Sequence, residues 1–178
     1  TIPAGLERYA DMGAALCPIP AGQKSPVGLI SSFKHDWSRD PTQWSEWSKQ
    51  FPDSNWIMVA GPSQKIIVDI DVKKAGRDAA WAEWAKWCAD RELPVFMPQV
   101  ETPSTGWHLY FDTAEVDLRQ PPLVSGVIDI RAGYGFVLIP PSQVDLDSEF
   151  SFGWIGRLIL VVNLQHCGWL LANIHIGE

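Results

Sequence analysis

The sequence predicts an α/β (α+β) fold in which a central sheet is flanked by helices. Three segments, 66–71, 107–111 and 127–131, alternate between aliphatic and ionisable residues, which is the period-two pattern of a strand with one polar face. Two other segments, 41–51 and 75–91, place large apolar residues at helical spacing. The chain has 178 residues, 46% of them hydrophobic, which suffices for one domain with a substantial core.

The helices are predicted from boundary signals and from tryptophan spacing. Asp40-Pro41 supplies an N-cap residue and a proline at the first helical position, and Pro52 ends that helix. A shorter helix is expected at 3–14. The apolar stripe of the second long helix consists of Trp81, Trp84, Trp87 and Cys88. Helical spacing favours a core role for this stripe, and for Trp37, Trp44 and Trp47, over a surface that stacks bases.

The other strands are predicted between turn signals. Gly61-Pro62-Ser63 separates 55–60 from 65–71, which predicts a hairpin-like pair. Further neighbouring strands are expected at 95–101 and 107–112, and strands joined by a turn at 126–131 and 136–139. A strand is also expected at 15–19, with long loops at 20–40 and 112–125. The apolar tail is expected to hold a strand or short helix at 158–162, and polar residues interrupt it too often for a membrane span.

Ionisable side chains gather on one face of the predicted sheet. Asp69 and Asp71 are two positions apart at a strand end, so they point to the same face. If the three alternating strands share a sheet, that face also receives His108, Asp129 and Arg131. Adjacent carboxylates repel one another, and a divalent metal with oxygen ligands commonly relieves this. The carboxylates can hold metal ions, and the neighbouring cationic groups can bind phosphate oxygens. Together they indicate a metal–phosphate site.

Each of these features also has a plainer explanation when it is taken alone. The two aspartates can be solvated acids at a strand terminus. His108 can be a satisfied strand histidine. Arg131 can reach a phosphate, or it can pair with Asp129 and orient it, and the pattern leaves both open.

Charge and cysteine content limit the classes of function. The net charge of −7 argues against a generally basic nucleic-acid binder, so any contact with DNA or RNA requires a local patch, bound metals or a fused domain. The three cysteines, Cys17, Cys88 and Cys167, form no C-x-x-C pair. Their spacing argues against a zinc site or a disulfide framework and for a reducing cytoplasm. The chain starts without a signal-peptide pattern.

Five short motifs follow one another between residues 15 and 142. They are Pro20-Ala21-Gly22-Gln23-Lys24-Ser25-Pro26, Val68-Asp69-Ile70-Asp71, Thr102-Pro103-Ser104-Thr105-Gly106-Trp107-His108, Gly126-Val127-Ile128-Asp129-Ile130-Arg131 and Pro140-Pro141-Ser142. In this order they resemble the bifunctional primase–polymerase (Prim-Pol) domain of plasmid and phage replication proteins, within the archaeo-eukaryotic primase superfamily. Thr105 departs from the pattern, because it stands where the family has the first glycine of a pair, and a β-branched residue resists positive φ.

The resemblance implies a fold, a reaction and a set of residue roles. It implies a central mixed sheet with an RRM-like catalytic half, a primase–polymerase catalytic domain at 1–150, and a C-terminal element of uncertain assignment at 151–178. The reaction is template-dependent nucleotidyl transfer, with Mg²⁺ or Mn²⁺ as cofactor. The implied metal ligands are Asp69, Asp71 and Asp129. The implied nucleotide-binding residues are His108, Arg131, Lys24, Ser104 and Thr105, with Ser142 as a further hydrogen-bond donor.

The implied partners are a single-stranded DNA template, NTP or dNTP, and a fused or separate helicase domain, with no membrane. Two alternatives remain open. One is a catalytically silent relative that binds nucleotide or nucleic acid. The other is a metal-dependent nuclease that uses the same acids, although the chain offers no clear lysine or histidine to activate water.

Overall fold

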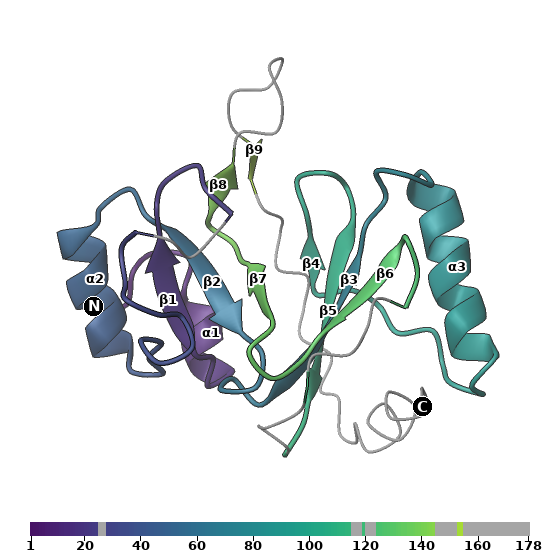
Figure 1. The fold of residues 1–178 in the computed structure, drawn as a ribbon, viewed down its shortest axis with the longest axis horizontal. Coiled ribbons are helices and arrows are strands. Elements are labelled where there is room, and N and C mark those ends of the chain that lie inside the picture. Colours follow the sequence, from purple (N-terminus) through teal and green to yellow (C-terminus); the bar gives the residue numbers. More distant parts are fainter. Residues whose placement is uncertain (25–27, 115–118, 120–123, 145–152, 155–178) are drawn as a thin grey trace.

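The computed structural model describes residues 1–24, 28–114, 119, 124–144 and 153–154. Within these residues the chain forms three helices and nine strands of an α+β fold (Figure 1). The helices are α1 (Glu7–Asp11), α2 (Pro41–Gln50) and α3 (Arg77–Ala89). The strands are β1 (Leu16–Ile19), β2 (Asn55–Val59), β3 (Lys65–Ile70), β4 (Val100–Glu101), β5 (Trp107–Asp112), β6 (Ile128–Arg131), β7 (Phe136–Leu138), β8 (Gln143–Val144) and β9 (Gly153–Trp154).

The strands form two main antiparallel sheets instead of the single mixed sheet predicted from the sequence. One sheet has the order β1-β2-β7 and the other the order β4-β5-β3-β6, while β8 and β9 pair separately. Figure 1 shows α1 and α2 beside the three-stranded sheet and α3 beside the four-stranded sheet. The prediction of a mixed sheet was therefore wrong, and an RRM-like arrangement stays a prediction.

The expected hairpin between 55–60 and 65–71 was also wrong. β2 pairs with β1 and β7, whereas β3 pairs with β5 and β6. The physical reason lies in the turn between them, where the backbone N–H groups of Ala60 and Gly61 donate to the carbonyls of Gly135 and Gly133. The chain thus stays hydrogen-bonded to the segment before β7 as it leaves β2, and then crosses to the second sheet.

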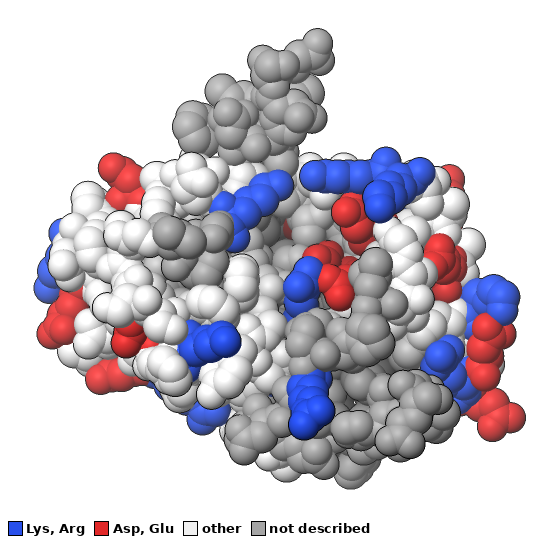
Figure 2. Space-filling view, in the orientation of Figure 1, with Lys and Arg blue, Asp and Glu red and all other residues white. Residues whose placement is uncertain are grey.

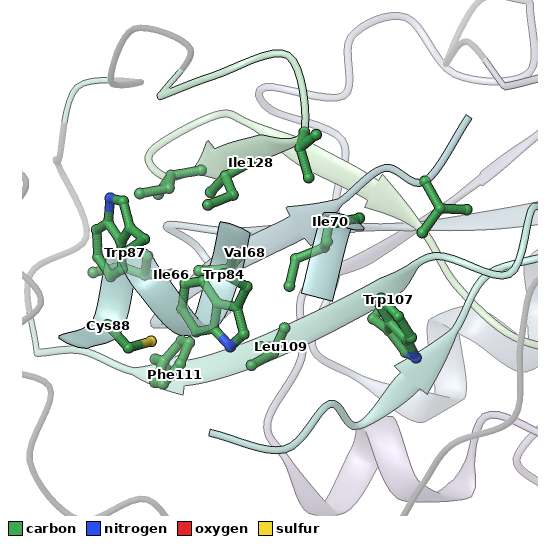
Figure 3. Close-up of a cluster of buried hydrophobic side chains, with 14 residues drawn as sticks. Ile66, Val68, Ile70, Trp84, Trp87, Cys88, Trp107, Leu109, Phe111 and Ile128 are labelled. Atoms are coloured by element: carbon green, nitrogen blue, oxygen red, sulfur yellow. The ribbon is translucent and has the colours of Figure 1, made fainter. Parts of the chain in front are cut away.

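One core lies between α3 and the four-stranded sheet (Figure 3). Val68 and Ile70 of β3 and Leu109 of β5 point into it, as alternation predicts. On the helix side, Trp84 is fully buried and stacks on Trp87, with ring centroids 5.2 Å apart. The predicted core role is therefore confirmed for Trp84, Trp87 and Cys88, whereas Trp81 is only partly buried at the edge of this core.

A second core joins the two sheets. Ile67 and Tyr110, on the face of the four-stranded sheet away from α3, pack with Met58 and Val137 of the three-stranded sheet. Trp44 of α2 is fully buried in the same cluster, which confirms its core assignment. The N-cap of α2 is as predicted, because the Asp40 carboxylate accepts a hydrogen bond from the Thr42 amide at 2.8 Å.

Two predicted elements are shorter than expected. Helix α1 covers five residues of the predicted 3–14, and β4 covers two residues of the predicted 95–101. The predicted element at 158–162 lies outside the described residues. Among the helices that the structure describes, none has the length and apolar character to span a bilayer.

Candidate active site on the four-stranded sheet

The ionisable residues of β3, β5 and β6 lie in one row across the sheet. Asp69 is directly opposite His108 of β5 on one side and Asp129 of β6 on the other. Residues that face each other across antiparallel strands project to the same side of the sheet. The prediction that these three side chains share one face is thus confirmed.

This row lies where the second core ends and a cavity begins. Towards one end of the face, Ile67 and Tyr110 are covered by the three-stranded sheet. Beyond them opens a cavity of about 270 Å³ whose polar lining includes Lys24, Asp69, Asp71, Lys73, Ser104, His108 and Arg131. Its opposite wall is apolar and comes mainly from β7, through Phe136, Val137 and Leu138. Figure 2 shows basic side chains around the hollow between the two sheets, with acidic side chains among them.

Asp69 is held in an unfavourable electrostatic environment. Burial raises the pKa of its carboxyl group, and the negative charges of Asp129 and Asp71 raise it further. His108 and Arg131 lower the same pKa but do not offset burial. A cation bound beside Asp69 would remove this penalty, so the site favours a positively charged ligand.

His108 is buried against this carboxylate. Its Nε2 atom lies 3.7 Å from Asp69 Oδ1, beyond hydrogen-bond distance, and its Nδ1 atom has no hydrogen-bond partner among the described residues. Burial lowers the pKa of His108, and the nearby Arg131 lowers it further, against the opposing effect of Asp69. The imidazole is therefore neutral near pH 7, and its unpartnered Nδ1 atom is itself buried.

The other two carboxylates are already engaged. Asp129 forms an ion pair with Arg131, which is one of the two roles that the sequence left open for this arginine, while Arg131 also lines the cavity. Asp71 accepts a hydrogen bond from the Lys73 backbone amide at 2.9 Å. Consistent with this, no group of three Asp, Glu, His or Cys side chains is arranged as a metal-binding cluster within the described part of the chain.

The oxygen donors of the site nevertheless fit a divalent cation by type. Asp69 and Asp129 face each other across a strand pair, and the pKa of Asp69 is raised mainly by burial and further by the negative charges of Asp129 and Asp71. Hard carboxylate oxygens are the ligands that Mg²⁺ and Mn²⁺ take in proteins. The residues present thus suit such an ion, although Asp129 has to be shared with Arg131 or released by it.

Lys24 reaches the cavity from a loop fixed by Asn55. The Asn55 side-chain amide donates to the carbonyls of Gln23 and Gln143, at 3.1 and 2.6 Å. Its oxygen accepts from the Gln143 amide at 2.8 Å. Asn55 is buried at the start of β2, so it anchors both the Lys24 loop and β8 to the three-stranded sheet.

The loop between β4 and β5 forms another edge of the cavity. Thr102 and Ser104 line it, whereas Thr105, a predicted nucleotide-binding residue, is not among the lining residues. Thr105 has φ of 64°, in the left-handed region that a β-branched residue resists, so the expected strain at this departure from the family pattern is present. Next to it, a Cβ atom on Gly106 would lie 2.3 Å from the Ile70 carbonyl oxygen, so this position requires glycine.

Arg77, at the start of α3, holds the same loop from the other side. Its guanidinium donates to Glu101 at 2.6 Å and to the Thr105 carbonyl at 3.2 Å. It also lies over the Trp107 ring at 4.7 Å. The loop shape therefore depends on a residue that sequence motifs did not single out.

Ser142 and the loop tryptophan lie away from the cavity lining. The Ser142 hydroxyl is buried, where it accepts from the Trp56 amide at 2.7 Å and donates to the Trp56 carbonyl at 3.1 Å. Its contacts are structural ones. The Trp37 indole donates to the Lys34 carbonyl at 3.1 Å.

Two groups of cavity residues were missed by sequence reasoning. Lys73 follows Asp71 at the same strand end, so the Asp71-Val72-Lys73 spacing could have revealed it. The β7 wall could not have been found in this way. Its residues read as an ordinary apolar strand, and only the packing of the two sheets brings them opposite the charged face.

Comparison with known families identifies the chain. Residues 6–156 match the family model Prim-Pol, described as bifunctional DNA primase/polymerase, N-terminal. The match covers most of the chain and includes all of the residues placed around the cavity, so the chain belongs to this family. No curated protein matches the chain. Family membership implies primase/polymerase activity, with DNA and nucleotides as substrates.

Proposed function

We propose that the cavity on the four-stranded sheet carries out nucleotidyl transfer for primer synthesis and DNA polymerisation. The observation that supports this most directly is the row of His108, Asp69 and Asp129 across three adjacent strands. Asp69 and His108 line a cavity with cationic side chains, and Asp129 lies beside Asp69 without being among the lining residues. In this reaction a 3′-hydroxyl oxygen bonds to the α-phosphorus of a nucleoside triphosphate. The hydroxyl proton is released to solvent water, the bond from the α-phosphorus to the oxygen that bridges it to the β-phosphorus breaks, and pyrophosphate leaves with the electron pair of that bond.

The residues divide into acidic and cationic groups that suit the two halves of this reaction. Asp69, Asp71 and Asp129 would hold Mg²⁺ or Mn²⁺. When bound, such ions neutralise phosphate charge and lower the pKa of the attacking hydroxyl. Lys24 and Lys73 provide positive charge at the cavity edge for the triphosphate, and Ser104 provides a hydroxyl donor. Neutral His108 donates a hydrogen bond to a phosphate oxygen without adding charge beside Asp69.

The wider setting follows from what this reaction needs. The substrates would be NTP or dNTP on a single-stranded DNA template, in the cytoplasmic replication of a plasmid, phage or other mobile element. A helicase domain, fused or separate, would supply the template. The catalytic unit would span 1–150, with 151–178 as a separate C-terminal element. The negative net charge of the chain supports reliance on a partner for part of the DNA affinity.

A second candidate is a nucleotide-binding module without catalysis. The observation in its favour is that Asp129 pairs with Arg131, and that no three acidic, histidine or cysteine side chains form a metal-binding group within the described ranges. Arg131 would then permanently occupy the carboxylate that a metal requires. Nucleotide binding through Lys24, Lys73 and His108 would persist.

Substitution of Asp69 separates these candidates. We expect Asp69→Asn to lower primer synthesis and extension on single-stranded DNA, with Mg²⁺ or Mn²⁺, on the order of a thousandfold, because a metal ligand contributes several kcal/mol. Mn²⁺ binding, followed by electron paramagnetic resonance, should weaken in parallel. Asp11→Asn, which removes an exposed carboxylate from α1, is the matched control and should change neither.

Loss of activity in this variant will not reflect unfolding. The pKa of Asp69 is raised in the folded state, so its charged form is unfavourable there at neutral pH. Asn removes that penalty, and we expect Asp69→Asn to be about 1 kcal/mol more stable at pH 7. The gain should disappear as the pH falls towards 3.8, the ordinary value of the carboxyl. Nucleotide binding without activity in the wild-type chain, with either metal, would favour the silent module.

A further inference from the structure

A second pocket lies outside the catalytic cavity, between the start of α3 and the segment before β4. It has a volume of about 510 Å³, and it is lined by Arg77, Asp78, Trp81, Ala82, Met97, Pro98 and Trp107. We call it the aromatic pocket. Trp81 is half-buried, and its ring meets that of Trp107 edge to face with centroids 5.2 Å apart. Met97 is 63% exposed, so the pocket is bordered by a large apolar side chain that faces solvent.

A basic segment connects this pocket to the catalytic cavity. Lys73 lines the cavity, Arg77 lines the aromatic pocket, and Lys74 lies between them in the sequence. Lys73 and Lys74 are exposed, and neither forms an ion pair with any residue that the structure describes. Figure 2 shows basic side chains along the rim of the hollow on the side of α3. In a chain of net charge −7, two adjacent uncompensated lysines are a local site for an anion.

The order of chemical groups along this path matches a nucleic-acid strand. Unpaired lysines suit backbone phosphates, and a half-buried indole in an open pocket suits the face of an unpaired base. Arg77 already lies over the Trp107 ring, so its guanidinium plane continues the aromatic surface. A double helix offers no unpaired base to such a pocket. The pocket volume of about 510 Å³ exceeds that of one base.

We propose that single-stranded DNA leaves the catalytic cavity over Lys73 and Lys74 and places one base in the aromatic pocket against Trp81. This inference deepens the proposed function, because it assigns a template path to the same catalytic domain. The path also runs beside the β4–β5 loop, since Arg77 contacts both the pocket and the Thr105 carbonyl. A bound base would thereby reinforce the loop that carries Ser104 into the cavity.

The test measures DNA affinity without catalysis. A fluorescein-labelled oligodeoxythymidylate is titrated with the full chain in EDTA, and anisotropy reports binding. We expect Trp81→Leu, which keeps apolar bulk but removes the indole face, to weaken binding on the order of tenfold. Lys74→Ala should weaken it more modestly and reduce the slope of log affinity against log salt by about 0.7. Lys49→Ala, which removes an exposed lysine from α2, is the matched control.

Several outcomes decide the matter. Trp81 also packs against the α3 core, so the thermal unfolding of Trp81→Leu is measured first. Cross-linking of an iodouracil-substituted oligonucleotide to the wild-type protein provides a second readout that does not depend on the folding of a variant. Cross-links at Trp81 or Met97 support the proposal. Unchanged affinity in Lys74→Ala and Trp81→Leu, or cross-links only outside the aromatic pocket, overturns it. Primer synthesis by the wild-type chain is measured separately, so failure of the proposed catalysis would be seen as absence of primer synthesis while oligonucleotide binding persists.

Discussion

The two faces of the four-stranded sheet are built from the same strands but differ in composition and burial. On the face towards α3, every inward residue of β3, β5 and β6 is apolar and buried. On the opposite face, the apolar pair Ile67 and Tyr110 gives way, two residues further along each strand, to the pair Asp69 and His108. The whole α3 face therefore contributes apolar burial to the stability of the fold. The opposite face does so only where the three-stranded sheet covers it.

The difference shows how the fold tolerates a costly site. Three ionisable residues in one row would be unfavourable at a sheet centre, because burial penalises their charged forms. Here the row lies just beyond the contact between the two sheets, beside a cavity of about 270 Å³ that admits water or ligand. The complete apolar core on the α3 side offsets the free-energy cost of the charged row on the opposite face.

The largest expected effect is on the α3 face. Trp84→Ala removes a fully buried indole that stacks on Trp87 and donates to the Phe96 carbonyl at 3.4 Å. We expect a loss of about 3–5 kcal/mol in the free energy of unfolding, measured in urea. Trp37→Ala, at a half-buried loop position, should lose much less. Equal losses would show that the α3 face is not the main source of stability.

The sequence predicted which side chains share a face of the sheet better than it predicted how the strands pair. Alternation predicted which side chains of each strand share a side, because strand residues two apart point the same way. That Asp69, His108 and Asp129 lie together also required the three strands to share one sheet, which the structure shows. It could not reveal that β2 and β3 enter different sheets, since the turn between them resembles a hairpin turn. The choice depends on long-range hydrogen bonds, such as that from Ala60 to Gly135, which no local pattern encodes.

The same limit applies within the site. The motifs identified Lys24 and Ser104, and both line the cavity. They could not decide whether Arg131 pairs with Asp129, because the long arginine side chain can reach either this carboxylate or a phosphate in the cavity. Arg77 went unnoticed for a related reason, since its partners Glu101 and Thr105 are distant in sequence.

The next largest effect is expected at the end of the sheet, where the β4–β5 loop packs against the end of β3. Gly106→Ala would place a methyl group 2.3 Å from the Ile70 carbonyl oxygen, which is backbone and cannot swing away. We expect a loss of about 1–3 kcal/mol in unfolding free energy, together with reduced primer extension as the loop moves from Asp71. Gly126→Ala, where nothing lies within 4 Å, should be nearly neutral. Matching effects at both glycines would contradict the close approach.

A smaller effect concerns protonation on the charged face. The pKa of His108 is lowered from its ordinary value of 6.5, so below about pH 6.5 the unfolded chain binds a proton that the folded chain resists. Stability should therefore fall with decreasing pH, by at most about 1.4 kcal/mol per pH unit, while above pH 6.5 the group has no effect.

Substitution assigns this pH dependence to one residue. His108→Gln should flatten the decline in unfolding free energy below pH 6.5, when wild type and variant are unfolded in urea across a pH series. His35→Gln replaces a histidine on the loop before α2 and serves as the control, which should retain the wild-type decline. A decline that persists in His108→Gln would place the responsible group elsewhere.

The smallest effect tests the strained residue at the edge of the site. Thr105 has φ of 64°, a conformation that costs an L residue about 1–2 kcal/mol. Glycine adopts this conformation without strain, but its greater conformational entropy in the unfolded chain costs about 0.5–1 kcal/mol. Thr105→Gly should thus gain up to about 1 kcal/mol in thermal unfolding. Ser104→Gly, whose backbone is outside the left-handed region, should lose stability. Because Arg77 donates to the Thr105 carbonyl, a backbone group that glycine also has, the gain should leave that hydrogen bond in place. A loss at both positions would mean that the threonine side chain itself stabilises the loop, and that the departure from a glycine pair is not a source of strain.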